Sequence, residues 1–295
     1  MPVKFVHLHL HTEFSLVDSL IRPKSLVKSV AESGMPAVAV TDQSNLCVLV
    51  KFFNAATAAG VKPLFGSDVW VDHGGGDLFR LVLLAANNEG YKNLTELLSR
   101  AYQEGQQQGK AVLQRQWLEA AADGLIVLSG GRDGDVGQSL VSENFSEAEQ
   151  LLRHWQSVFG DRFYLELIRT GRENEENYLH AAVDLAAKCD CPVVASNDVR
   201  FLKAEDFEAH DTRVCIGEGR ALDDPRRQKS YSEQQYLRSE DEMCELFSDI
   251  PEALENSVEI AKRCNVTLRL GEYFLPDYPV PEGKTMDEFF REFSY

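Results

Sequence analysis

A repeated alternation of short apolar runs with helical segments is the feature that most constrains the fold of this chain. Runs rich in Val, Ile and Leu recur at 4–10, 36–42, 62–71, 78–86, 124–131, 162–168 and 191–198. Segments with helical apolar spacing separate most of them, at 22–33, 45–60, 88–105, 146–159 and 173–189. This alternation is typical of parallel strands that are buried on both faces. About seven such units without a GxGxxG turn favour a closed α/β barrel over a doubly wound sheet.

The C-terminal third follows a different pattern. From about residue 202 the sequence is mainly helical, as in "SEDEMCELFSDIPEALENSVEIAKRC". We therefore expect one domain over 1–270, with a barrel core at about 1–200 and a helical remainder at 201–270. Residues 271–295 are expected to be a linker and the start of a following region. An amphipathic segment begins at "MDEFFREFSY" and is cut short, which indicates a fragment of a longer polypeptide.

The charge balance argues against one class of function. Among 295 residues there are 47 acidic and 30 basic side chains, and the net charge is −17. A surface that binds duplex DNA needs clustered cations that displace counterions, so we expect little direct DNA binding. The densest basic run, "DDPRRQK" (223–229), is interpreted as a solvated loop.

Compartment and redox state also follow from composition. No window has the roughly 18–20 apolar residues that span a bilayer, and the first residues lack the apolar core of a secretion signal. A cytoplasmic protein without a membrane partner is expected. The six cysteines include one Cys-x-Cys pair at 189 and 191, which is poor spacing for zinc, so reduced and mostly buried thiols are expected.

Polar side chains collect where the expected strands end, and in a parallel barrel this end carries the chemistry. The residues at these positions are His9, His11, Asp18, Gln43, Asp68, Arg80, Gly131, Glu166, Arg169, Asp198 and Arg200. A His-x-His step on a strand places both rings on one face, with Cα atoms roughly 6.5–7 Å apart. Two imidazoles and several carboxylates have the ligand chemistry of a zinc or manganese site. A histidine pair that only hydrogen-bonds within a core stays open as the alternative.

The other histidines are given structural roles. His7 lies deeper on the same face of the first expected strand and is interpreted as a support for the two that follow. The remaining ones are expected to serve packing or the surface, at positions 73, 154, 180 and 210.

Several motifs together carry a family resemblance. They are "FVHLHLHTEFSLVDS", "AVTDQSNL", "LVLLAANNEGYKNLTELL", "LIVLSGG", "YLELIRTG", "VVASNDVRFL" and "LGEYFLPDYPVP". In this order they resemble the PHP (polymerase and histidinol phosphatase) domain at the N-terminus of bacterial DNA polymerase III alpha subunits, of the proteobacterial type. The resemblance covers nearly the whole chain. It implies a distorted seven-stranded TIM-like barrel with a C-terminal mainly helical extension, and it implies that the region after residue 270 begins the polymerase part.

The resemblance also implies a set of site positions. In metal-binding members, ligands at the barrel mouth hold up to three ions, and by motif they fall here on His9, His11, Asp18, Gln43, Asp68, Arg80, Gly131, Asp198 and Arg200. Such members usually have His where Gln43, Arg80 and Arg200 stand, Cys or His at Gly131, and Glu at Asp68. These departures put the trinuclear site in doubt.

Arginine has a fixed positive charge and no lone pair to donate to a metal. We therefore expect Arg80 and Arg200 to pair with acids of the pocket and to replace the charge of the ions. Gln43 and Gly131 are lost ligand positions. No cofactor is expected, although one zinc or manganese ion on His9, His11, Asp68 and Asp198 stays open, because the resemblance implies that these four form one subsite.

Two functions follow as hypotheses. The first is a structural and partner-docking module of a replicative DNA polymerase, with no catalytic residue in this chain. The resemblance then implies contacts with the rest of the alpha chain and with the proofreading exonuclease subunit epsilon, and magnesium in a polymerase domain that this chain lacks. The second is an active metal-dependent phosphoesterase, such as a pyrophosphatase, a phosphatase or a 3′–5′ exonuclease-like enzyme.

Overall fold

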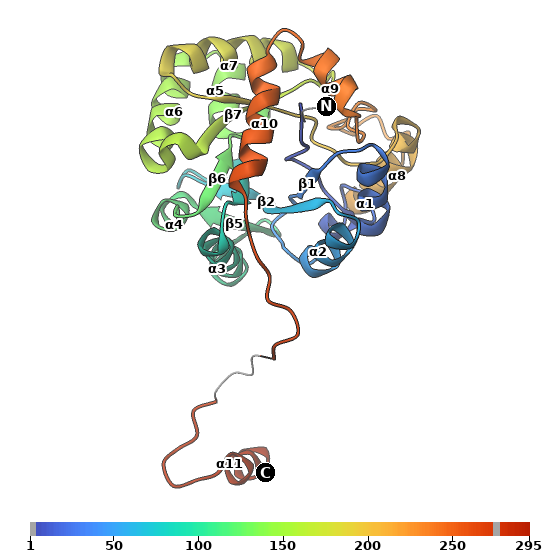
Figure 1. The fold of residues 1–295 in the computed structure, drawn as a ribbon. Helices are drawn as coiled ribbons and strands as arrows, with labels where there is room; N and C mark the ends of the chain where they lie inside the picture. Colours follow the sequence, from blue (N-terminus) through green and yellow to red (C-terminus); the bar gives the residue numbers. More distant parts are fainter. Residues whose placement is uncertain (1–3, 274–277) are drawn as a thin grey trace.

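The computed structural model describes residues 4–273 and 278–295 and has a mixed α/β fold (Figure 1). Its strands are β1 (Ala37–Val40), β2 (Lys62–Asp72), β3 (Leu78–Ala85), β4 (Gln106–Gln107), β5 (Lys110–Gln114), β6 (Leu125–Leu128), β7 (Phe163–Ile168) and β8 (Val193–Ser196). They form one sheet in the order β4-β5-β2-β3-β6-β7-β8, with β1 also paired to β2. The expected α/β class is confirmed.

Strand direction differs from the expectation at β3. The pairs β1–β2, β2–β5, β6–β7 and β7–β8 are parallel, but β3 is antiparallel to both β2 and β6. The connection from β2 to β3 is a short turn, in which the Asp72 carboxylate accepts hydrogen bonds from the amides of Gly74 and Gly76. Both glycines have positive φ, +93° and +86°. A turn of this length can join only antiparallel neighbours, since a parallel pair needs a long crossover.

Two further strands lie where the sequence analysis found no apolar run, since β4 and β5 form a small antiparallel hairpin between α3 (Asn88–Glu104) and α4 (Arg115–Ala120). β5 then pairs with the end of β2, while the start of that strand pairs with β1. The long β2 thus pairs with two strands along the same edge, with β1 at its start and with β5 at its end.

The N-terminal segment, expected to be a strand over 4–10, forms no regular strand. His7 O accepts from Ala39 N (2.9 Å), whereas His9 O accepts from Val199 N (3.1 Å) and His11 N donates to Val199 O (3.0 Å). Its backbone hydrogen bonds thus go alternately to β1 and to the chain after β8. Because of this division no continuous ladder forms on either side. The segment nevertheless connects β1 with the chain after β8, which do not pair with each other.

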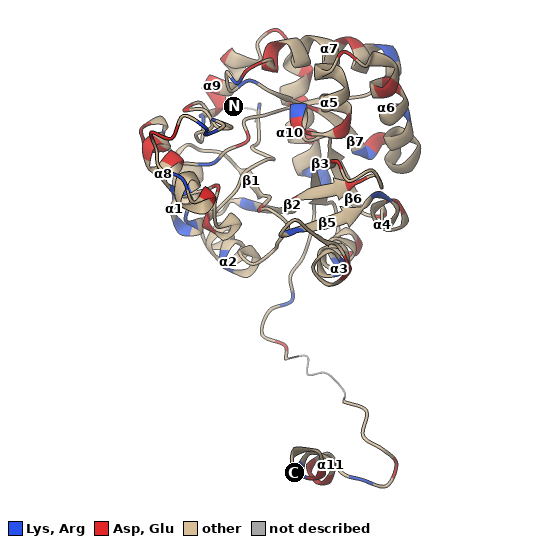
Figure 2. Cartoon of the chain, turned by 180° about the vertical axis from the view of Figure 1, so that it is seen from behind, with Lys and Arg blue, Asp and Glu red and all other residues tan. Residues whose placement is uncertain are grey.

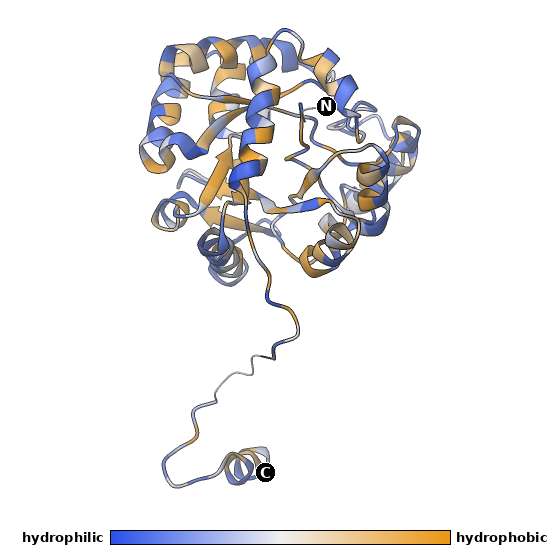
Figure 3. Ribbon diagram, in the orientation of Figure 1, coloured by the Kyte–Doolittle hydropathy of each residue, from blue (hydrophilic) through white to orange (hydrophobic). Residues whose placement is uncertain are grey.

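Side chains of the central strands are buried on both faces. In β3, Leu81 and Leu83 pack with the outer helices, whereas Val82 and Leu84 point to the opposite face, where they pack with Leu8 and other residues. This is the period of two that a pleated strand imposes. Figure 3 shows the corresponding colours, with hydrophobic strands inside and hydrophilic outer sides on the helices.

The helices surround the sheet, and acidic and basic residues are spread over their outer sides (Figure 2). They are α1 (Pro23–Glu32), α2 (Leu49–Ala58), α3 (Asn88–Glu104), α4 (Arg115–Ala120), α5 (Asp135–Val141), α6 (Phe145–Phe159), α7 (Glu175–Cys189), α8 (Phe207–Glu218), α9 (Glu240–Leu246), α10 (Pro251–Arg263) and α11 (Met286–Ser294), with 3₁₀ turns at Glu13–Ser15, Gly131–Asp133, Gly160–Arg162 and Ala204–Asp206. α1 and α10 both begin with proline, which is favoured there because its missing N–H has no partner in the first turn.

The C-terminal part confirms the expected helical character. α10 packs against β8, whereas α11 lies apart from the barrel in Figure 1 and has no buried residue. None of the helices in 4–273 and 278–295 has the length and apolar character needed to cross a membrane. The domain limits, 1–270 and 271–295, stay a prediction.

Candidate functional site

Seven of the expected site residues gather at one end of the barrel. The N-terminal segment supplies His9 and His11, β2 supplies Asp68, β3 supplies Arg80, and three loop residues complete the group, Asp18, Asp198 and Arg200. The least buried side chains of this group, Asp18 and Arg80, are only 13% and 12% exposed. Ionisable groups this deeply buried need partners, because an unpaired buried charge is costly.

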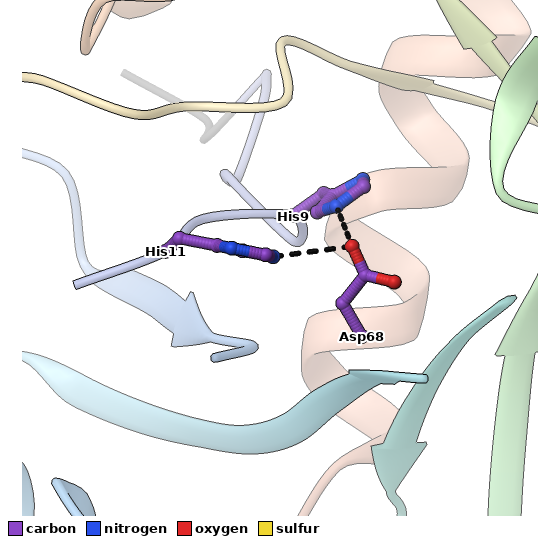
Figure 4. A group of neighbouring side chains, drawn as sticks. All are labelled: His9, His11 and Asp68. Carbon is purple, nitrogen blue, oxygen red and sulfur yellow. Dashed lines mark hydrogen bonds and ion pairs between the residues drawn. The ribbon is translucent and has the colours of Figure 1, made fainter. Parts of the chain in front are cut away.

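The two histidines point at one carboxylate (Figure 4). The Nε2 atoms of His9 and His11 both lie 3.1 Å from Oδ2 of Asp68. One ligand-type atom from each of the three residues lies within 4.8 Å of the other two, a spacing that can hold a metal ion. The alternation of leucine and histidine over residues 8–11 explains this convergence. Leu8 and Leu10 are fully buried in the core, so His9 and His11, which alternate with them, face the mouth.

Arg80 reaches the same carboxylate from the neighbouring strand. Its Nε donates to Oδ1 of Asp68 (3.2 Å) and its Nη2 donates to Oδ2, so the pair is bidentate. In the antiparallel register Arg80 lies opposite Trp70, two residues along β2 from Asp68. The antiparallel direction of β3 therefore brings this arginine to the mouth at the beginning of its strand, not at its end.

Arg200 is fully buried and joins two further acids. Its Nη1 donates to Asp18 and its Nη2 donates to Asp198. Burial alone would raise the pKa of both carboxyl groups, but the charge of Arg200, together with the charges of Arg80 and a neighbouring histidine, outweighs it and holds each pKa below its ordinary value. Asp18 and Asp198 are therefore ionised, and Arg200 neutralises part of their charge.

Arg200 also fixes the protonation of His11. Its Nη1 donates to Nδ1 of His11. Burial, and after it the charge of Arg200, lowers the pKa of His11 to about 4, so the ring is neutral at pH 7. Nδ1 also lies 3.2 Å from Oδ1 of Asp18. Because a guanidinium has no acceptor, the contact with Arg200 favours the tautomer with the ring proton on Nε2, from which it is donated to Asp68. In this tautomer His11 points an N–H and no lone pair at the candidate metal position.

His9 has a different environment, which involves Glu166, a residue expected at the mouth but not among the ligand positions. Its Nδ1 lies 2.8 Å from Glu166 Oε1, and the hydroxyl of Ser196 donates to the same oxygen. Its Nε2 lies 3.2 Å from Asp198 Oδ1 in addition to Asp68. A carboxylate behind a histidine is the usual device that orients a metal ligand. The signal in the sequence was a single acid within an apolar strand, "YLELI".

The two lost ligand positions are filled differently. Gln43 lies beside the cluster, and its side-chain amide donates to the backbone oxygen of Asp68 (2.9 Å). Gly131 is buried with φ +58°, and a Cβ added there would be 2.8 Å from Cδ1 of Ile168. The positive φ strains any side chain at this position, and Ile168 would have to shift to admit one.

Other polar groups of the mouth serve as supports. The ring of His7 donates to Arg238 O (2.8 Å), and His210 Nε2 donates to Asp18 O (2.9 Å). Burial lowers the pKa of His7 to about 4 and lowers that of His210, so both stay neutral donors. Arg169, although expected near the mouth, pairs with Asp249 on the outside.

These residues do not fit the full metal set of the resembling family. Arginines occupy two ligand positions, and Gln43 and Gly131 offer no usual ligand. The chemistry of a single ion fits His9, His11 and Asp68, but a lone pair on His11 Nε2 would require a tautomer that Arg200 opposes. An ion would also compete with Arg80 for Asp68.

Comparison with known proteins gives consistent matches. The sequence profile of the PHP domain family matches residues 7–170. The DNA polymerase III subunit alpha of Pseudomonas aeruginosa is 59% identical over the whole chain, and that of Escherichia coli is 55% identical over 96% of it. The chain spans about a quarter of the length of these relatives, 25% in each.

A solved amidohydrolase from Chromobacterium violaceum aligns with a TM-score of 0.44 and 16% identity, over 66% of this chain and 87% of that one.

Proposed function

Since this chain belongs to the PHP domain family, we propose that it is a structural and partner-docking module of a DNA polymerase III alpha subunit, with a PHP site that hydrolyses nothing. The observation that carries the proposal is the position of Arg200, which is fully buried and bound to Asp18, Asp198 and His11. A guanidinium at this place supplies the positive charge that a PHP hydrolase takes from metal ions. It cannot lower the pKa of a bound water, which is the task of the metal in hydrolysis.

The finer parts of the proposal concern the whole protein. Its polymerase activity, with magnesium in a domain beyond this chain, rests on the names of the relatives. We place residues 1–270 in the PHP unit and 271–295 in the connection to the polymerase part. The partners are the rest of the alpha chain and the epsilon subunit, and the compartment is the cytoplasm.

Metal content tests the site. The protein, purified without chelator, is analysed by inductively coupled plasma mass spectrometry. We expect well under one zinc or manganese ion per chain, and no phosphoesterase activity after either metal is added. One stoichiometric ion together with metal-dependent hydrolysis would refute the inactive site.

Partner docking is tested separately. Size-exclusion chromatography of the chain with purified epsilon subunit should give one co-eluting complex. The double variant Arg169→Gln/Asp249→Asn, which loses the outer ion pair but keeps the site residues, is run beside the wild-type chain to compare their binding to epsilon. If wild-type chain and epsilon elute apart at micromolar concentration, the docking part of the proposal fails, while the conclusion on the metal site stands.

A metal-dependent phosphoesterase is the second candidate, and one observation favours it. His9 is backed by Glu166 on one nitrogen and faces Asp68 and Asp198 with the other. A bound ion would supply an activated water to such a site. In that case His9, Asp68 and Asp198 would bind the ion and fix its position, and Arg80 would have to give up its ion pair with Asp68.

A further inference from the structure

A groove follows the outer contact between α1 and α2, two helices that lie side by side in Figures 1 and 2. Two adjoining cavities of about 860 and 480 Å³ form it, and Lys24 and Ala55 line both of them. Their lining residues are separate from those of the candidate metal site. Each helix has 10 residues and so a length of about 15 Å. We call this surface the α1–α2 groove.

The floor of the α1–α2 groove consists of small apolar side chains. α2 with its C-cap contributes Ala55, Ala58 and Ala59, and α1 contributes Ala31 beside the buried Val27. Positions three and four apart lie on one side of a helix, so the three alanines of α2 share a face. Their methyl groups let the backbone of a third helix come close and leave room for larger apolar side chains on that helix.

The rim of the α1–α2 groove is basic, although the net charge of the whole chain is −17. Its charged residues are four cations and two acids, namely Arg22, Lys24, Lys28, Lys51, Glu13 and Glu32. Each acid pairs only loosely with a rim cation, at 3.9 Å for Glu13 and 3.8 Å for Glu32. Lys24 and Lys51 form no ion pair within 4–273 and 278–295, so their charges can bind an acidic partner.

This combination of charge and shape favours a protein helix over a nucleic acid. Cations at the rim attract an acidic segment and repel a basic one. A phosphate backbone needs cations along its path and gains nothing from an apolar floor, whereas an amphipathic helix uses both. The expected occupant therefore has larger apolar residues on one face and Asp or Glu beside them.

The chain after α10 runs past the same two helices, which indicates where the occupant comes from. Val266 and Leu268 pack against the hydrophobic cluster that contains Leu26 of α1 and Phe52 of α2. In Figures 1 and 2 the chain leaves the barrel between α2 and α3. On the proposed function the polymerase part follows this stretch. A segment tethered so close to the groove reaches an effective concentration of about millimolar.

We propose that the α1–α2 groove binds an acidic amphipathic helix from the polymerase part of the same polypeptide. The inference rests on the proposed function in one respect, namely that residues 271–295 lead into that part. It gives the module a docking surface for its own chain, apart from the surface that binds the epsilon subunit.

Hydrogen–deuterium exchange tests the occupant. Mass spectrometry follows amide exchange of residues 22–32 and 49–59 in the 295-residue chain, in the full alpha chain, and in the full chain with epsilon or primed DNA added. We expect at least about tenfold slower exchange in the full alpha chain alone than in the 295-residue chain, because docking raises the free energy of local opening. Epsilon or DNA should slow it by less than about twofold more.

Two variants of the full alpha chain separate charge from shape. Lys24→Glu with Lys51→Glu reverses both unpaired charges, whereas Ala58→Arg fills the floor and adds a cation. All three positions are exposed, and both variants should return the exchange to within about twofold of that in the isolated chain. A nucleic acid would instead bind Ala58→Arg more tightly. Lys92→Glu with Lys188→Glu is the matched control, since these lysines are 67% and 64% exposed and lie outside the groove.

Four results would overturn the inference: equal exchange of the two helices in both chains, protection that appears only with epsilon or DNA, full protection in Ala58→Arg, or equal loss in the lysine control. Slower exchange at another surface of the barrel, without these helices, would overturn the groove and keep the docking function. Equal exchange over the whole barrel would count against the proposed docking function itself. The conclusion on the metal site depends on none of these results.

Discussion

The guanidinium of Arg200 donates a hydrogen bond to Nδ1 of His11, and this contact favours a proton on the other ring nitrogen, Nε2. In a metal site, the partner behind a histidine is an acceptor, which holds the proton on the far nitrogen and leaves the near one free for the ion. Here a donor, Arg200, lies at that place together with the carboxylate of Asp18, whose Oδ1 is 3.2 Å from Nδ1. The contact with Arg200 favours the reversed tautomer, in which His11 is a hydrogen-bond donor to Asp68.

Asp198→Asn should destabilise the domain. The change leaves the fully buried Arg200 with one carboxylate instead of two, and breaking a buried pair costs about 3–5 kcal/mol. Urea denaturation measures the free energy of unfolding. Asp249→Asn, which breaks the outer pair with Arg169, is the control and should cost less than about 1 kcal/mol. A melting temperature that rises in Asp198→Asn would contradict the ion-pair account.

The combined replacement of Gln43, Arg80 and Arg200 by histidine should create metal binding. It removes two cations that compete with an ion and frees Nδ1 of His11 from its donor. We expect about one zinc ion per folded chain by mass spectrometry, against well under one in the wild type. Replacement of Arg80 and Arg200 by glutamine, with Gln43 unchanged, removes the charges without adding ligands and should bind less. A folded histidine variant without zinc would show that these positions do not share one site.

Gly131→Cys, the remaining ligand replacement, should fail by strain. The positive φ of +58° and the contact with Ile168 Cδ1 together should cost about 2–4 kcal/mol in the free energy of unfolding. Ile168→Val removes the Cδ1 atom and should recover part of that loss in the double variant, although Ile168→Val alone should be mildly destabilising. Additive effects of the two changes, measured by chemical denaturation, would contradict the contact.

Thiol reactivity should separate the cysteines. All six are free, and Cys47 is exposed. Burial raises the pKa of Cys191 and Cys264 to about 12, so neither forms thiolate at pH 8. Ellman's reagent should react rapidly with Cys47, and Cys47→Ser should remove the fast phase. Rapid reaction of several thiols in the native protein would contradict the described burial.

The same thiols set a dependence of stability on pH. The ordinary thiol pKa of 9 applies to the unfolded chain, whereas the folded Cys191 and Cys264 keep their protons up to about pH 12. Between these values the unfolded state binds fewer protons, so stability should fall as the pH rises. Denaturation at pH 8 and pH 10.5 measures the loss, and Cys264→Ala should reduce it. An unchanged or larger loss in that variant would contradict the assignment to Cys264.

The amino-acid sequence by itself determined the α/β class, the buried state of the strands and most of the residues at the mouth, but not Arg169, which pairs with Asp249 on the outside. These follow from local patterns: the period of two in "HLHLH" turns His9 and His11 away from the core because Leu8 and Leu10 must be buried. The family resemblance assigned Arg80 and Arg200 to ligand positions, and chemistry alone then predicted the loss of those ligands, since a guanidinium has no lone pair to donate.

Only the tertiary structure decided the direction of β3, the division of the N-terminal segment between two neighbours, and the partners of each charged group. Glu166 gained its role from its contact with His9, which is far away in the sequence, and such contacts leave no periodic signal. The tautomer of His11 belongs to the same class, because it depends on Arg200, which is 189 positions away along the chain and adjacent in space. A sequence pattern can record which residues are buried, because burial follows local periodicity. The pairing of buried charges depends instead on which groups the tertiary fold brings within hydrogen-bonding distance.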